Sequence, residues 1–147
     1  MPVFPSVEWF NAIKDLVNVD PAFRQLGTVD AVIGAKIGSK VYELTFEAFE
    51  CTGVREVSDN ELRDMDFWLE QSYDQWKDML ENIKEHGAAD LSHTLNTIDL
   101  SLPTGLAQSQ DGYRRDAFYR FNQSIQDFFN AAAKIDTTFA TLEAVSA

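Results

Sequence analysis

The sequence predicts an α+β fold, in which amphipathic helices cover the apolar face of a hairpin-rich sheet. Between residues 29 and 70, apolar residues recur at every second position over several short segments, which is typical of strands with one buried face. Before and after that region, apolar residues recur three and four positions apart, which is typical of helices. Because the apolar face of each helix must be buried, we expect the helices to pack on the sheet.

The chain begins with two predicted helices. Ser6 is a suitable N-cap for the first, whose apolar residues follow the helical spacing. Those residues are Trp9, Phe10, Ile13, Leu16 and Val17. Asp20 followed by Pro21 is a cap with proline at the first helical position, which predicts a short second helix over residues 21–26.

Four alternating segments then predict four strands, over residues 29–37, 40–47, 49–57 and 65–70. Gly38 and Ser39 between the first two favour a tight two-residue hairpin turn, and Gly53 is a candidate bulge in the third. We expect one buried row of apolar side chains on each strand. In the second and fourth strands these rows are Tyr42, Leu44 and Phe46, and Met65, Phe67 and Leu69.

A third helix should begin after Ser72, because Ser72 and Gln75 have the spacing of a capping box, and should end near Gly87. Its apolar residues are Tyr73, Trp76, Met79, Leu80 and Ile83. Asp90 is a candidate cap for a further short helix through Leu95. A fifth strand is expected where apolar residues alternate at Ile98, Leu100 and Leu102, followed by a loop over residues 104–112.

The C-terminal third has the clearest helical spacing, which predicts an extended amphipathic helix over about residues 111–135. Its apolar stripe comprises Phe118, Phe121, Ile125, Phe128, Ala132 and Ile135, and the same spacing continues beyond residues 136–138 through Phe139 and Leu142. We expect residues 116–133 to lie on the body of the same chain as a lid, and the tail beyond Asp136 to be a homodimer contact. No linker interrupts the sequence, so residues 1–147 are predicted to form a single domain.

The charge excludes some partners. With 24 acidic and 12 basic residues the net charge is −12, which disfavours sequence-independent binding to nucleic acid and docking by charge on anionic membranes. No apolar stretch is long enough for stable insertion into a membrane, and residues 1–5 do not resemble a signal peptide. A single cysteine requires no oxidising compartment, so a cytoplasmic location is expected.

Few residues form a catalytic or metal-binding pattern. The segment 34–40 is one residue too short for a phosphate-binding loop, and a hairpin turn explains it better. His86, Asp90 and His93 would align on one unbroken helix, but Gly87 is expected to break it. Cys51 lies on an apolar strand face and is expected to be a small buried residue. The sequence therefore predicts no cofactor, no metal and no catalytic residue.

The chain is rich in large apolar side chains, with 11 Phe, 3 Trp and 4 Tyr. Composition alone favours an ordinary core, whereas the alternative is that the same residues line a cavity for an apolar ligand. On that interpretation the candidate ligand-binding residues are Tyr42, Leu44, Phe46, Phe67, Trp76, Met79, Leu80, Ile83, Phe118, Phe121, Ile125 and Phe128.

The order of these segments resembles that of the sterol carrier protein type 2 family over about residues 6–100. The similarity is carried by residues 9–13, 18–23, 38–46, 64–69 and 72–80. It implies a five-stranded, mainly antiparallel sheet covered by helices, with an apolar tunnel that binds fatty acyl chains, sterols or related lipids without catalysis. The glycine-rich step of that family is absent from residues 93–100.

Two other hypotheses remain open. One is a small α+β enzyme, such as an isomerase or hydratase, which acts on a hydrophobic substrate and needs an ionisable group inside its pocket. The other is an interaction module that dimerises through its C-terminal segment.

Overall fold

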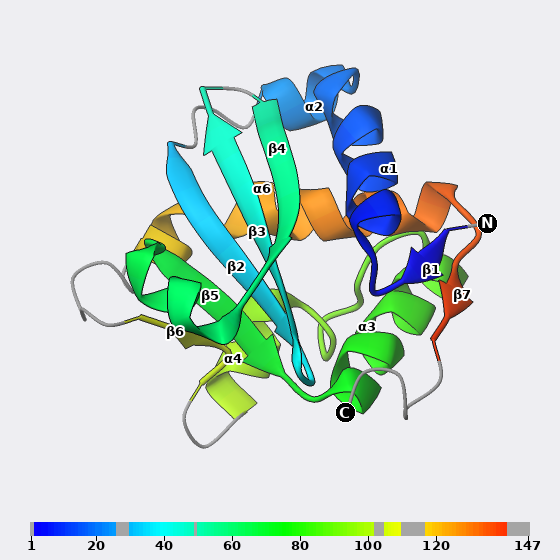
Figure 1. Ribbon diagram of the computed structural model, residues 1–147. Coiled ribbons are helices and arrows are strands. Elements are labelled where there is room, and N and C mark those ends of the chain that lie inside the picture. Colours follow the sequence, from blue (N-terminus) through cyan, green and yellow to red (C-terminus); the bar gives the residue numbers. More distant parts are fainter. Residues whose placement is uncertain (1, 26–29, 49, 102–104, 110–116, 141–147) are drawn as a thin grey trace.

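A five-stranded mixed sheet with helices packed on one face forms the body of the protein (Figure 1). The computed structural model describes residues 2–25, 30–48, 50–101, 105–109 and 117–140. The sheet order is β4-β3-β2-β5-β6. These strands are β2 (Ala31–Ile37), β3 (Lys40–Glu47), β4 (Glu50–Val57), β5 (Phe67–Gln71) and β6 (Ala107–Gln108). All neighbours pair antiparallel except β2 and β5, so the expected mainly antiparallel sheet is confirmed, with one parallel pair.

The parallel pair arises from a crossover between β4 and β5. The 3-10 helix η1 (Asp59–Asp64) follows β4, and β5 then pairs beside β2 rather than beside β4. A direct hairpin would have returned the chain antiparallel, whereas a crossover brings it back in the same direction. Ser58 is the N-cap of η1, with a capping box formed by Ser58 and Glu61.

The β2–β3 hairpin has the predicted two-residue turn. Ile37 pairs with Lys40, and Gly38 has a φ of 59°, a conformation that glycine adopts without strain. A bulge also occurs in β4. Because Thr45 pairs with Gly53 and Phe46 with Cys51, the extra residue is Thr52, one position before the predicted site.

The first three helices begin where their caps predict. Helix α1 (Val7–Asn18) is capped by Ser6, and α2 (Pro21–Arg24) by Asp20, while residues 26–29 lie outside the described residues. Helix α3 (Tyr73–His86) has the predicted capping box at Ser72 and ends at Gly87, which has a φ of 84°.

The prediction of a strand around Ile98 and Leu100 is wrong, because these residues belong to helix α4 (Leu95–Ser101). The side chain of Thr94 accepts a hydrogen bond from the backbone N–H of Thr97 and so caps this helix. Leu95 and Ile98 are three positions apart and pack on the core, whereas Leu100 is 75% exposed. The spacing is thus helical, and the last strand is instead β6, within the predicted loop; Leu102 lies outside the described residues.

The C-terminal segment consists of helix α6 (Ala117–Asn130), the 3-10 helix η2 (Ala131–Lys134) and strand β7 (Thr138–Phe139). Residues 111–116 of the predicted helix lie outside the described residues. In Figure 1, α6 runs across the strands on the side of the sheet that carries the helices. Strand β7 pairs in parallel with β1 (Val3–Phe4), so this part of the predicted dimer tail contacts its own chain.

The opposite face of the sheet has a smaller apolar cluster of Val41, Leu62 and Met65 beneath η1. The expectation that Met65 shares a face with Phe67 and Leu69 is wrong. The reason is local: Met65 is the C-cap of η1 and precedes β5, so it does not follow the alternation of the strand.

Replacing Gly34 with alanine is expected to lower the free energy of unfolding by about 1–3 kcal/mol, because the added methyl group overpacks this second cluster. A Cβ at Gly34 would lie 2.7 Å from Met65 Sδ and 2.8 Å from Trp68 Cβ. Gly53→Ala is the matched control, since no atom lies within 4 Å of its Cβ position. Urea denaturation of both variants measures the difference, and equal stabilities would contradict the close packing at Gly34.

Candidate functional site

The inner face of the sheet is one continuous apolar surface. Strands β2, β3 and β5 each direct alternate side chains toward the helices. The registered pairs Ile33–Phe67 and Ala35–Leu69 place the rows of β2 and β5 side by side. The predicted row of Tyr42, Leu44 and Phe46 continues the same surface on β3.

Helices α3 and α6 supply the opposing surface. The predicted residues of α3 (Trp76, Met79, Leu80 and Ile83) are buried in the same cluster as the sheet face, as are Phe118, Ile125 and Phe128 of α6. Phe121 is partly buried and packs against that cluster. The structure therefore brings all twelve candidate ligand-binding residues into one layer between sheet and helices.

Aromatic contacts fill much of this layer. The ring centroids of Phe67 and Phe118 lie 5.9 Å apart, and those of Phe46 and Phe128 lie 5.6 Å apart, both edge to face. The ring of Trp76 lies 5.3 Å from that of Phe129, a buried residue that the three-four spacing did not select. The sequence feature that indicates burial of Phe129 is its position next to Phe128, because apolar residues at two neighbouring positions widen the apolar face of a helix.

A groove of about 370 Å³ opens where α3, η2 and β7 meet. Its lining includes Leu80, Ala132 and Phe139, and Leu80 and Ala132 also belong to the main core cluster. The groove also has charged lining residues, namely Glu81, Lys84, Glu85 and Asp136. The Lys84 ammonium lies 3.1 Å from Asp136 and donates to the carbonyl of Ile135, so its charge is already compensated.

Gln71 is the last residue of β5 and is only 6% exposed. Neither its carbonyl oxygen nor its amide nitrogen has a hydrogen-bond partner among the described residues. A buried polar group without a partner costs about 1–3 kcal/mol. Sequence reasoning missed this residue, although it continues the alternation of Phe67 and Leu69 and so had to point inward.

The side-chain oxygen of Asn122 in α6 is a further buried atom without a hydrogen-bond partner among the described residues. Asp99 is the only buried carboxylate among the described residues, and it accepts hydrogen bonds from the backbone N–H groups of Leu106 and Ala107. Burial raises the pKa of the Cys51 thiol to about 11 and that of the Tyr42 phenol to about 12. The thiol is therefore protonated at neutral pH, and Cys51 is the small buried residue expected from the sequence.

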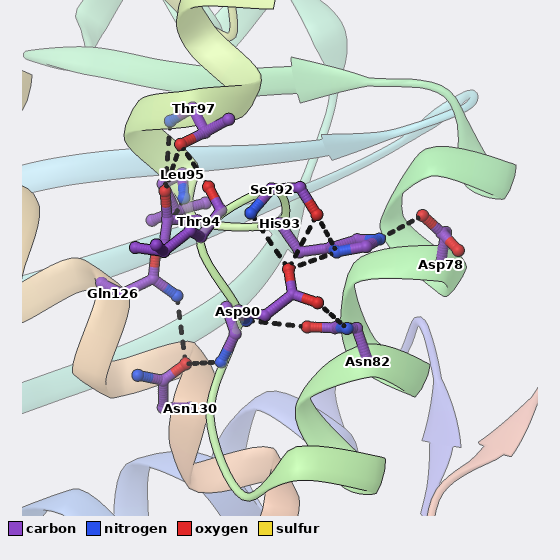
Figure 2. A network of polar contacts seen from close by, with 12 residues as sticks. Asp78, Asn82, Asp90, Ser92, His93, Thr94, Leu95, Thr97, Gln126 and Asn130 are labelled. Atoms are coloured by element: carbon purple, nitrogen blue, oxygen red, sulfur yellow. Dashed lines mark hydrogen bonds and ion pairs between the residues drawn. The ribbon is translucent and has the colours of Figure 1, made fainter.

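A polar network joins α3 to the turn before α4 (Figure 2). The side-chain amide of Asn82 donates a 2.9 Å hydrogen bond to the carboxylate of Asp90 and accepts one of 2.9 Å from the backbone N–H of Asp90. Asp90 also lies 2.7 Å from Nδ1 of His93, and Asp78 lies 2.9 Å from Nε2 of the same ring. Asp90 thus organises the turn before α4 rather than capping a helix. His93 lies between two carboxylates. In the described part of the chain, no group of three or more His, Cys, Asp or Glu residues is arranged to hold a metal ion.

Further hydrogen bonds extend this network to α6. The side chain of Asn130 accepts from the backbone N–H of Ala89, and that of Gln126 accepts from the backbone N–H of Leu95 at 2.7 Å (Figure 2). Gln126 also donates a hydrogen bond to Asn130. The two α6 residues therefore hold both ends of the 89–95 segment against the helix. The network therefore holds α3, α4 and α6 together at one end of the apolar layer.

The stability of the protein is expected to fall as the pH rises above about 6.5, the ordinary pKa of histidine. The carboxylates of Asp90 and, to a lesser extent, Asp78 raise the pKa of His93 in the folded state. A raised folded-state pKa stabilises the fold fully below the unfolded-state pKa, and this stabilisation is lost as the pH rises through the folded-state value. Denaturant unfolding of His93→Gln should therefore show a smaller decline than the wild type.

The matched control for this pH dependence is His86→Gln, since His86 is exposed at the end of α3. It should keep the wild-type decline. A decline that persists unchanged in His93→Gln would contradict the role of the two carboxylates.

None of the described helices is both long enough and apolar enough to cross a membrane.

No family model matches this chain, and no curated protein matches its sequence. The structure does match two solved structures. The crystal structure of sterol carrier protein 2 matches with a TM-score of 0.65 and 15% identity, over 89% of this chain and 98% of that chain. The solution structure of a conserved hypothetical protein from Thermus thermophilus, which its description links to sterol carrier protein, matches with a TM-score of 0.63 and 17% identity, over 90% of this chain and 89% of that chain. The chain therefore has the sterol carrier protein fold, as the sequence predicts.

Proposed function

We propose that this protein binds a hydrophobic small molecule, such as a lipid, a fatty acyl chain or a sterol-like compound, in an apolar tunnel between the sheet and helices α3 and α6, and carries it without catalysis. The observation that carries the proposal is that the groove is continuous with the core. Leu80 and Ala132 line the open groove and also pack in the main cluster, so a ligand in the groove would touch the layer formed by the twelve candidate residues.

The size and chemistry of the groove fit this role. A volume of about 370 Å³ lies within the range of small-molecule sites, which is roughly 300–1,000 Å³. Its apolar lining would bury the hydrocarbon part of a ligand, with a gain of about 25 cal/mol per Å² of apolar surface. The likeness to sterol carrier protein 2 supports the same class of ligand.

Lid and dimer roles for the C-terminal segment belong to this proposal as well. Helix α6 packs on the apolar layer and would cover the bound ligand. A homodimer contact would have to come from residues other than Thr138 and Phe139, which already pair with β1. The mass of the protein in solution tests the dimer. We expect the carrier to act in the cytoplasm, which fluorescence microscopy of a tagged protein tests.

Binding can be tested directly. Native mass spectrometry of freshly purified protein should show a bound apolar molecule, and a polarity-sensitive fluorescent fatty acid should bind to the emptied protein. Glu81→Trp should weaken fluorophore binding about tenfold, because this exposed residue lines the groove and an indole there would fill it.

Val19→Trp is the matched control for Glu81→Trp. Val19 is 78% exposed and lines a separate surface pocket of about 410 Å³, so an indole there should leave binding unchanged. Absence of any binding to the wild type would refute the proposed function. Equal losses in the two variants would refute the assignment to the groove.

A further inference from the structure

Gln71 lies at the point where the chain passes from strand β5 to helix α3. It shares the inward face of β5 with Phe67 and Leu69, and it pairs in parallel register with the buried Ile37 of β2. The next residue, Ser72, caps helix α3, which supplies the opposite wall of the proposed tunnel. A carboxamide is therefore placed among apolar neighbours at one end of the layer.

The carboxamide has both a donor and an acceptor without partners in the described part of the chain. Buried polar side chains almost always have partners, so an orphaned pair of this kind indicates a missing polar group. A leucine would fill a similar volume without this cost, and packing alone therefore gives no reason for glutamine at this position.

The charged residues that precede Gln71 and its register partner on β5 and β2 lie on the other face of the sheet. Lys36 and Glu70 precede Ile37 and Gln71 in the register, so their side chains point away from the apolar layer. Consistent with this, Lys36 pairs with Asp59, and Glu70 accepts a hydrogen bond from the indole of Trp68. An ionised group beside Gln71 would thus meet a neutral amide and no counter-charge from these two strands, which is unfavourable in an apolar interior.

We propose that Gln71 binds the polar end of the ligand, and that this end is an uncharged group that both donates and accepts a hydrogen bond, as a hydroxyl or a primary amide does. This inference rests on the proposed function. The ligand hydroxyl donates to Oε1 of Gln71 and accepts from Nε2, which satisfies both orphaned atoms. The groove favours the same class of ligand, because its lining carries three carboxylates and one ammonium that is already paired, and this repels anionic molecules.

The test compares four ligands with the same hydrocarbon chain: dodecanol, dodecanamide, methyl dodecanoate and dodecanoate. Each displaces a fluorescent long-chain alcohol, an uncharged probe, from the wild type, from Gln71→Leu and from the control Gln25→Leu, whose glutamine is exposed. We expect the wild type and the control to bind the alcohol and the amide about tenfold more tightly than the ester or the carboxylate, since the ester cannot donate. In Gln71→Leu the alcohol and the ester should bind equally.

A second measurement separates ligand binding from a structural role. Removal of an unsatisfied buried amide should raise the urea midpoint of the ligand-free Gln71→Leu protein, whereas loss of a structural hydrogen bond would lower it. A lower midpoint, or an alcohol-to-ester ratio that Gln71→Leu leaves unchanged, overturns the inference. Wild-type binding without preference for the alcohol also overturns it while the proposed function stands, and a wild type that binds none of the probes overturns both.

Discussion

Replacing Trp76 with alanine is expected to lower the free energy of unfolding by about 3–5 kcal/mol, a core-sized loss. Trp76 is fully buried, and its ring packs on those of Phe4 and Phe129. Its indole N–H also donates a 2.9 Å hydrogen bond to the carbonyl of Lys36 in β2, so the variant loses a link between α3 and the sheet. Urea denaturation followed by circular dichroism measures the change as a shift in midpoint.

Trp68→Ala is the matched control for this experiment. Trp68 is half-buried on the opposite face of the sheet, and its indole donates to the exposed Glu70. Its replacement should lower the free energy of unfolding by less than half as much as the replacement of Trp76. Similar losses in the two variants would contradict the central packing of Trp76.

Truncation after Gly112 is expected to abolish cooperative unfolding, because it removes α6. Phe118, Phe128 and Phe129 of that helix are fully buried, and each buried phenylalanine contributes about 1.5–3 kcal/mol. Their sum is comparable to the whole stability of a typical domain, about 5–15 kcal/mol. The shortened chain should show no sharp thermal transition and should bind dyes that recognise exposed apolar surface.

Truncation after Ile135 removes less of the chain and should lower the free energy of unfolding by about 2–6 kcal/mol. It removes four hydrogen bonds, each of which contributes about 0.5–1.5 kcal/mol. Thr137 accepts from the buried indole of Trp9, and the carbonyl of Ala140 accepts from the hydroxyl of Tyr73. The backbone N–H groups of Thr138 and Ala140 donate to the carbonyls of Pro2 and Phe4. A cooperative transition after truncation at Gly112 would contradict the role of α6 in the core. An unchanged free energy of unfolding after truncation at Ile135 would contradict the contribution of the four hydrogen bonds.

Local patterns predicted the elements whose ends are set by neighbouring residues. The capping box at Ser72 and the turn at Gly38 depend on residues within a few positions, so the sequence identified both. The apolar face of each element was predictable for the same reason, because periodicity is a local property. This is why all twelve candidate residues lie in one layer.

Features that depend on distant partners were not predictable in this way. The spacing of the apolar residues around Ile98 is compatible with a strand and with a helix. The segment is helical because Leu95 and Ile98 pack on the core from one helix face. The parallel pairing of β5 with β2 depends on a crossover that no alternation reveals. Likewise, nothing near Gln71 in the sequence shows that its amide lacks a partner, since that depends on every element packed around it.

The pairing of β1 with β7 has a consequence for how the protein is made. The hydrogen bond from Trp9 to Thr137 spans 128 residues. At the usual synthesis rate of about 5–20 residues per second, roughly 6–26 seconds separate the two residues on the ribosome. During that interval Phe4 and Trp9 have been made but have no β7 to pack against, so the aromatic cluster around α1 cannot reach its native packing until residue 139 has been synthesised.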